Sequence, residues 1–307
     1  MMQTSKTTVV LAGLVLGLSA CTTAVGPSLT APTTPPTTDP VIVAAGDIAC
    51  APGQVRTTTT CHQGDTAALL AGADKVLTLG DQQYEKATLA EYQAVYDPTW
   101  GWRKADTAPV PGNHEYTTPA AQGYFDYFGA AAGNPGEGYY SFDVGTWHIV
   151  ALNTGSPGVV PVKEGSLQNN WLEADLAAHP ADCILAFWHH PRWPAGQYGS
   201  TRGAAAYKDL AAAHADVVLT GHAHNYQRWA PMNRTGVPSA TGIRQFVVGT
   251  GGKSQHAPNA TSPVGLEEAQ GHTFGVLTMS LRAGSYTWTF LPDTPGGYTD
   301  TGTGECV

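Results

Sequence analysis

Five apolar runs in this sequence each end in a glycine or a turn that is followed by Asp, Asn or His. The residues that follow these runs are Asp47, Asp81 with Tyr84, Asn113 with His114, His189 with His190, and His222 with His224. Together they offer a mixed nitrogen and oxygen ligand set, which suits zinc, iron or manganese better than calcium. The set is too large for one tetrahedral ion, so the pattern predicts two metal ions bridged by a carboxylate, most simply Asp81. Two such ions, ~3.5–4 Å apart, can clamp a phosphoryl group and activate a water for in-line attack.

The elements that must position these residues alternate between strands and helices. Strands are predicted over 41–45, 75–79, 108–111, 184–188 and 217–220, a hairpin over 139–153, and helices over about 64–72, 88–97, 167–179 and 203–213. The segment after Gln245 is expected to be mostly strand. Parallel β-α units mixed with hairpins predict two sheets with helices outside them. Because ligands bind beyond the carboxyl ends of strands in open α/β sheets, the polar strand ends are expected to converge.

The ordered motifs Gly-Asp, Gly-Asp-x-x-Tyr, Gly-Asn-His-Glu, His-His-Pro and Gly-His-x-His resemble those of calcineurin-like metallophosphoesterases. Within that superfamily, the sequence most resembles the purple acid phosphatases. The resemblance covers residues 41–307 and implies an α/β fold, a four-layer α/β/β/α sandwich of two mixed β-sheets flanked by helices. It implies a first metal held by Asp47, Asp81, Tyr84 and His224, and a second held by Asp81, Asn113, His189 and His222.

The resemblance also implies roles for the other motif residues. A metal-bound hydroxide would be the nucleophile, and His114 would face the substrate, stabilising the transition state or protonating the leaving group. Asn113 and His190 would contact the substrate, although a packing role for His190 is an equal alternative. We therefore expect a phosphatase that hydrolyses phosphomonoesters. A phosphodiesterase or nucleotide hydrolase with the same metal site and a non-catalytic phosphate- or metal-binding lipoprotein are the alternatives.

One position departs from most of the superfamily, which has Asp-x-His after the first strand. Here the third residue is Ala49, which cannot ligate a metal. Tyr84 stands where the purple acid phosphatases have a ligand tyrosine, and a phenolate stabilises a ferric ion. We expect Fe(III) in the Tyr84 site and Zn, Fe or Mn in the second. The alternative is that Tyr84 only packs and that the first metal lacks one ligand.

The N-terminal residues have the pattern of an export signal. Lys6 precedes an apolar run over 9–18, which is too short to span a bilayer comfortably. Residues 18–21, Leu-Ser-Ala-Cys, resemble the lipobox of bacterial lipoproteins, which implies a signal peptide over 1–20 and lipidation of Cys21; an ordinary cleaved signal is the alternative. The Thr- and Pro-rich residues 21–40 are expected to form a linker. We therefore expect an exported protein, anchored to the cell membrane by lipid and facing outside the cytoplasm.

Charge and cysteine content agree with this picture. The net charge of −9 argues against nucleic-acid partners and direct binding to anionic membranes, but bound metal ions could still attract a phosphate ester. An even number of cysteines beyond Cys21 predicts disulfides in an exported chain, from the set Cys50, Cys61, Cys183 and Cys306. Cys50 with Cys61 is the favoured local pair, but sequence leaves three pairings open.

Five of the remaining histidines divide into two groups. His148, His179 and His214 are expected to be structural, because they lie in or beside predicted elements away from the motifs. His62 and His256 lie near the motifs and could reach the metal site.

Overall fold

The computed structural model describes residues 39–196, 198, 200–258 and 263–307. The predicted signal peptide, Cys21 and most of the predicted linker lie outside these residues. Residues Asp39–Val307 form one compact unit. In the described part of the chain, no helix is both long and apolar enough to cross a membrane.

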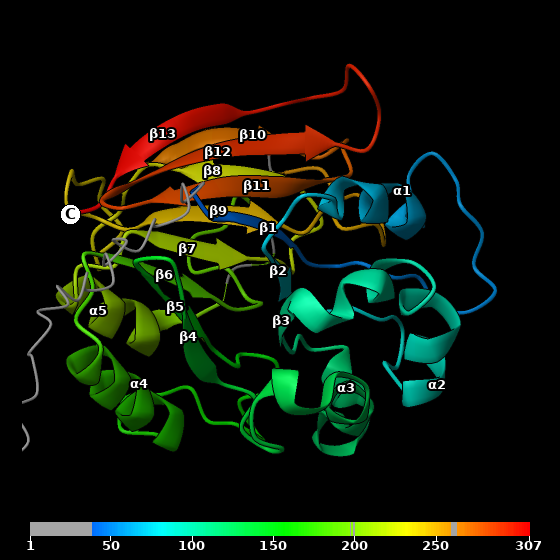
Figure 1. Ribbon diagram of the computed structural model, residues 1–307, viewed down its shortest axis with the longest axis horizontal. Coiled ribbons are helices and arrows are strands. Elements are labelled where there is room, and N and C mark those ends of the chain that lie inside the picture. The colour runs from blue at the N-terminus through cyan, green and yellow to red at the C-terminus, as the bar shows by residue number, and fades with distance from the viewer. Residues whose placement is uncertain (1–38, 197, 199, 259–262) are drawn as a thin grey trace, which may run out of the picture. The chain divides into compact units, whose positions relative to one another are not determined.

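The described strands form two mixed β-sheets (Figure 1). The first sheet has the spatial order β13 (Thr301–Glu305), β12 (Ser285–Pro292), β11 (Gly275–Arg282), β1 (Val41–Ala45), β2 (Lys75–Leu79) and β3 (Thr107–Val110). The second has the order β10 (Leu266–Gln270), β8 (Tyr226–Trp229), β9 (Arg244–Val248), β7 (Val217–Thr220), β6 (Cys183–Phe187), β5 (Trp147–Ala151) and β4 (Tyr140–Val144). Strands β1, β2 and β3 are parallel to one another, as are β5, β6, β7 and β9.

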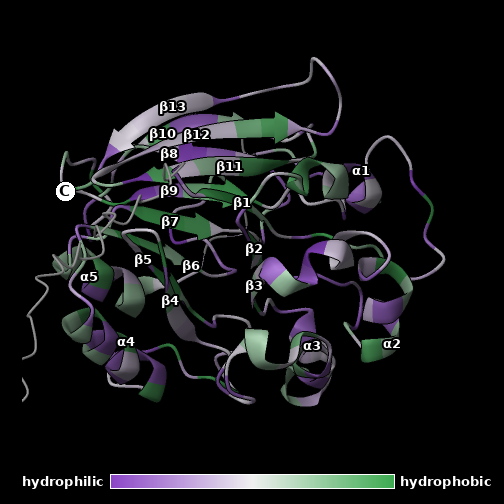
Figure 2. Cartoon of the chain, viewed as in Figure 1, coloured by the Kyte–Doolittle hydropathy of each residue, from purple (hydrophilic) through white to green (hydrophobic). Residues whose placement is uncertain are grey.

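The main core lies between the sheets because their central strands are apolar on both faces. Every residue of β6 is buried, as expected for a strand covered on both sides. In β12 the buried Tyr286, Trp288 and Phe290 alternate with partly exposed residues, which is the period of a strand with one covered face. Figure 2 shows this contrast, with β1 and β7 largely hydrophobic and β13 paler.

Helices flank the two sheets. The helices α1 (Gln63–Ala67), α2 (Leu89–Glu91) and α3 (Gln122–Phe128) share an apolar cluster with strands of the first sheet. The helices α4 (Leu167–Ala178) and α5 (Ala204–Ala212) pack against the second sheet, where Leu172 and Leu210 meet Ile184 and Val218. This arrangement confirms the predicted fold class.

The predicted helix over 88–97 is found in two parts. Thr88 caps α2 in a reciprocal arrangement with Glu91, and Tyr92–Tyr96 then forms a π-helical segment. Tyr92 stacks on Tyr127 with ring centroids 4.8 Å apart, and both rings are edge-on to Phe128. The departure from regular helix geometry thus lies within an aromatic cluster.

Two disulfides, Cys50–Cys61 and Cys183–Cys306, are present, each with Cα atoms 5.4 Å apart. They confirm the prediction of disulfides and the favoured local pair. Cys183–Cys306 ties the end of the chain after β13 to the first residue of β6.

Candidate metal centre

The motif residues meet at one edge of the sandwich, beyond the carboxyl ends of β1, β2, β3, β6 and β7. The first donor residue of each motif lies two or three residues after the end of the strand that precedes it. The parallel strands of each sheet bring these ends to the same edge. The structure brings together every residue predicted to bind metal: Asp47, Asp81, Tyr84, Asn113, His189, His222 and His224.

Asp47 lies at the centre of the first group of donors. The Tyr84 hydroxyl donates to Asp47 Oδ1 at 2.8 Å and lies 3.0 Å from Asp81 Oδ2. His224 Nε2 lies 3.0 Å from the Tyr84 oxygen and 3.2 Å from Asp47 Oδ1. These are the four residues predicted for the first metal, and Tyr84 is turned toward its partners rather than only packed.

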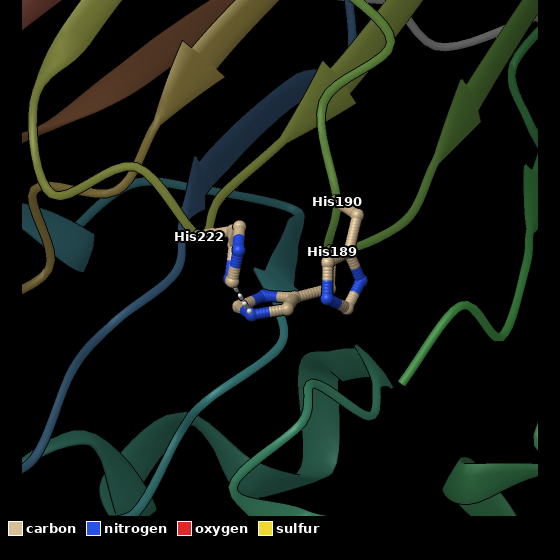
Figure 3. Close-up of side chains that lie close together, drawn as sticks. All are labelled: His189, His190 and His222. Carbon is tan, nitrogen blue, oxygen red and sulfur yellow. Dashed lines mark hydrogen bonds between the residues drawn. The ribbon is translucent and has the colours of Figure 1, made fainter. Parts of the chain in front are cut away.

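His189 lies at the centre of the second group. Its Nε2 is 3.2 Å from each of Asp81 Oδ2, Asn113 Oδ1 and His222 Nδ1. Figure 3 marks the contact between the His189 and His222 rings, which meet edge to face, with a dashed line. The other nitrogen, Nδ1, donates to the Leu79 carbonyl at 2.8 Å, which leaves Nε2 directed at the group. Asp81 belongs to both groups, so its carboxylate has the position that a bridging ligand needs.

The glycines of the motifs are required because the donors pack against the backbone. A Cβ at Gly112 would lie 2.2 Å from Asp81 Oδ1, and one at Gly80 would lie 2.5 Å from His189 Nδ1. Three site residues also adopt the left-handed region, with φ between 49° and 69°: Asp47, Asp81 and His222. Such strain is typical of functional sites, where the surrounding structure holds it in place.

Two residues that the sequence analysis did not assign hold the donors in place. Ser254 Oγ lies 2.6 Å from His224 Nδ1 and so fixes the orientation of that imidazole. The buried carboxylate of Glu115 accepts hydrogen bonds from the backbone N–H groups of Asp81, Gln82 and Gly112, at 2.9, 3.0 and 2.7 Å. Burial, followed by the nearby Asp81 charge, raises the pKa of Glu115 to about 7. The motif Gly-Asn-His-Glu contained this residue, but sequence gave no sign of its clamping role.

Two buried carboxylates at the site need positive charge beside them. Asp47 and Asp81 are 0% and 2% exposed. Burial raises the pKa of Asp81, but the His189 imidazole outweighs this effect and brings the pKa below its ordinary value. Burial likewise lowers the pKa of His189, and the Asp81 carboxylate reverses this and raises the pKa to about 9. His189 and Asp81 therefore share a proton between their lone pairs. A metal ion would bind the same lone pairs in place of that proton, so the donor set fits metal ions.

Two other motif histidines, His114 and His190, lie beside the predicted metal ligands. His114 lies at the rim, with its side chain 25% exposed and Nδ1 2.7 Å from the Glu85 carbonyl. His190 is buried; its Nδ1 lies 3.0 Å from Thr154 Oγ1, and its Nε2 lies 2.8 Å from Arg202 Nη1. Both nitrogens of His190 are therefore engaged within the protein, and its predicted contact with substrate stays a prediction.

The two histidines expected near the motifs differ in position. His256 stacks on His224 with ring centroids 4.3 Å apart and so reaches the centre. His62 instead contacts Asp293 and the Thr57 carbonyl.

Known proteins share this sequence pattern and fold. The family model for calcineurin-like phosphoesterases matches residues 40–226, which include every candidate metal residue. Purple acid phosphatase 21 of Arabidopsis thaliana is 30% identical over 125 residues, covering 38% of this chain and 27% of that protein.

Solved structures show the same fold at low sequence identity. The purple acid phosphatase PPD1 from yellow lupin superposes with a TM-score of 0.68 at 17% identity, over 86% of this chain and 53% of that chain. GAP50, the anchor in the inner membrane complex of Plasmodium, gives 0.65 at 14% identity, over 86% and 88% of the two chains. PhoD gives 0.59 at 14%, over 88% and 70%. The chain spans about a quarter of the Arabidopsis relative and about half of the lupin chain. On the family match, the chain belongs to the calcineurin-like phosphoesterase family.

Proposed function

We propose that this chain is a metal-dependent phosphatase that hydrolyses phosphomonoesters outside the cytoplasm. The observation that carries the proposal is the Asp81 carboxylate, which two separate groups of nitrogen and oxygen donors share. When bound there, two ions would supply Lewis acidity toward the phosphoryl group and an activated water. The first group is Asp47, Asp81, Tyr84 and His224, and the second is Asp81, Asn113, His189 and His222.

Tyr84 supports a ferric ion in the first group. Burial, followed by the charges of Asp47 and Asp81, raises the pKa of the Tyr84 hydroxyl well above its ordinary value. Loss of that proton beside two carboxylates needs a strongly charged ion to offset it, and Fe(III) offsets it better than a divalent ion. Zn, Fe or Mn is proposed for the second group.

His114 supports turnover rather than binding alone. Its Nδ1 faces the Glu85 carbonyl at 2.7 Å, so this nitrogen carries the N–H and Nε2 can exchange a proton with a bound ester. The partial exposure of the ring leaves it accessible from solvent. Asn113 directs its carbonyl oxygen at His189, which leaves its side-chain amide to donate to a phosphate oxygen.

The proposed location rests on the sequence alone. Lipidation of Cys21 would anchor the chain, and a Cys21→Ala variant tests it in a bacterial host. We expect the wild-type chain to take up radiolabelled palmitate and to partition into detergent, and the variant to do neither. Equal labelling of both chains would refute the anchor without bearing on the phosphatase.

The enzymatic proposal is tested with 4-nitrophenyl phosphate and its bis-ester. We expect faster hydrolysis of the monoester, at least two metal equivalents by elemental analysis and a visible tyrosinate–iron band that Tyr84→Phe abolishes. His114→Ala should retain both metals and lose turnover by about 10²–10⁴-fold. Faster bis-ester hydrolysis would indicate a diesterase, and no turnover with any ferric or divalent ion supplied would refute the enzyme. Iron bound without the band would refute ligation by Tyr84.

A further inference from the structure

A second cluster of histidine and aspartate lies at the end of the second sheet opposite the metal centre. His148 is the second residue of β5, which runs parallel to β6, so it lies far from the strand end that carries His189. Asp143 is on the neighbouring strand β4. Asp175 lies on α4 and His179 caps that helix, so the four-residue spacing puts both on one face.

His148 faces a carboxylate at each ring nitrogen. Its Nδ1 lies 3.0 Å from Asp143 Oδ1 and its Nε2 lies 2.9 Å from Asp175 Oδ2. The residue is 2% exposed, so water cannot separate these groups. A neutral imidazole has one N–H, and its other nitrogen presents a lone pair, which a carboxylate oxygen repels. The arrangement therefore needs a positive species between His148 and one carboxylate, either a second proton or a metal ion.

His179 supplies a second imidazole beside the same carboxylate. Its Nδ1 lies 3.2 Å from Asp175 Oδ1, and its side chain is 52% exposed. The rings of His148 and His179 stack with centroids 4.9 Å apart and planes 15° apart. Their lone pairs are thus not yet directed at one point, and the ring of His179 must turn about its side-chain bonds, which its exposure allows.

A surface cavity of about 440 Å³ gives access to the cluster. Its lining includes Asp143, His148, His179 and Asp182. An entering ion would meet carboxylates at the rim before reaching the buried imidazole. Ligand atoms of His148, Asp175 and His179 all lie within 4.8 Å of one another. His179 Nδ1 now contacts the Asp175 backbone carbonyl at 3.0 Å, so a turn of the His179 ring toward an ion would exchange that contact for a metal bond.

We propose that His148 Nε2, the Asp175 carboxylate and His179 bind a divalent transition metal of the zinc class. Two imidazoles and one carboxylate are a common zinc set, completed by water. Asp143 would accept the Nδ1–H of His148, which fixes the tautomer that directs Nε2 at the ion. The ion would fasten the β4–β5 hairpin to the end of α4. This site is separate from the proposed phosphatase and does not depend on it.

His62 offers an instructive contrast. Its Nδ1 lies 2.5 Å from Asp293 Oδ2, but its Nε2 faces the neutral carbonyl of Thr57 at 2.8 Å. The same Nδ1 lies 3.4 Å from Asp65 Oδ2, so both charged acceptors of His62 are at one ring nitrogen. At His148 both acceptors carry charge and a second imidazole lies beside them, which is the combination that favours a metal over a proton.

The test is zinc binding by the whole protein in three forms: wild type, His179→Ala and His272→Ala. His272 is another exposed histidine and serves as the matched control. At the zinc concentration that just fills the wild-type sites, we expect elemental analysis to find one more equivalent in wild type and His272→Ala than in His179→Ala. Titration should show the affinity for that equivalent falling more than about 100-fold, because removing a direct ligand costs more than removing its supporting partner.

Thermal unfolding provides a second measurement. Zinc should raise the Tm of wild type and His272→Ala by more than that of His179→Ala, and His148→Gln should lose the same part of the shift. Equal zinc content and equal Tm shifts in wild type and His179→Ala would overturn the proposal. Because His179 is exposed, its replacement answers the question even if His148→Gln fails to fold.

Discussion

Glu115 gives the sharpest prediction about how the metal centre is held. Its carboxylate is fully buried and accepts three backbone hydrogen bonds of 3.0 Å or less from the loops after β2 and β3. Glu115→Ala removes both acceptor oxygens and therefore all three of these hydrogen bonds, together with the one from the Tyr92 hydroxyl. The N–H groups of Asp81, Gln82 and Gly112 are then left in the interior, and Asp81 loses the contact that fixes its backbone.

Two opposing effects set the size of the stability change. Three buried N–H groups without acceptors cost roughly 3–9 kcal/mol in all. Removing a buried charge returns about 3 kcal/mol, because the pKa of Glu115 is raised from 4.5 to about 7, chiefly by burial. We therefore expect Glu115→Ala to lower the free energy of unfolding by about 3 kcal/mol at pH 8. Glu115→Gln removes the charge and, with its amide nitrogen in the Oε1 position, loses only the acceptor of the Gln82 N–H, so its net change is about zero.

Urea unfolding of metal-free wild type and both variants at pH 8 measures these differences. Metal titration should then show weaker binding by Glu115→Ala than by Glu115→Gln, because only the former leaves the Asp81 backbone without its acceptor. An alanine variant as stable as wild type would refute the clamp. A glutamine variant as unstable as the alanine variant would show that the charge, rather than the acceptors, holds the loops.

Three further predictions concern other parts of the molecule. Ser254→Ala should weaken metal binding at the His224 group by about 10–100-fold, with little change in the free energy of unfolding. Only the hydrogen bond that orients the His224 imidazole is lost. Unchanged affinity in a metal titration would contradict this. Burial raises the folded-state pKa of Asp216 from 3.8 to about 6, so the folded chain binds the proton more tightly and stability falls as pH rises between these values. Urea unfolding at pH 4 and pH 7 should show a fall of about 2 kcal/mol in wild type that Asp216→Asn lacks, and equal pH dependence would refute the assignment. Replacing both cysteines of Cys183–Cys306 by serine should lower the free energy of unfolding by about 5 kcal/mol, against about 3 kcal/mol for Cys50–Cys61. The reason is that the two bridges span 123 and 11 residues. The reverse order in urea unfolding would exclude loop entropy as the main source of their stabilisation.

Sequence alone determined the local features of the site. Each apolar run predicted a buried strand. The glycine that follows such a run lies where a donor side chain packs against the backbone, as at Gly80 and Gly112. Strand ends of one orientation must share an edge, so the convergence of the donors followed from the order of the elements. The chemistry of those donors then predicted metals.

Tertiary structure decided what no local pattern could report. The glycine-rich β13 has little strand propensity, yet Gly302 and Gly304 lie so close to Trp288 and Tyr286 that a Cβ at either would come within about 2.5 Å of an aromatic ring. Packing across the sheet thus overrides propensity.

The contacts of Glu115 and His148 could not be predicted from the sequence, because some of their partners are distant along the chain. The backbone groups of Asp81 and Gln82 bound by Glu115 are 34 and 33 residues away along the chain, and Asp175 is 27 residues from His148. Periodicity along a chain records which side chains are buried. It does not record which buried group will face which, because that depends on the folded arrangement of elements distant in sequence.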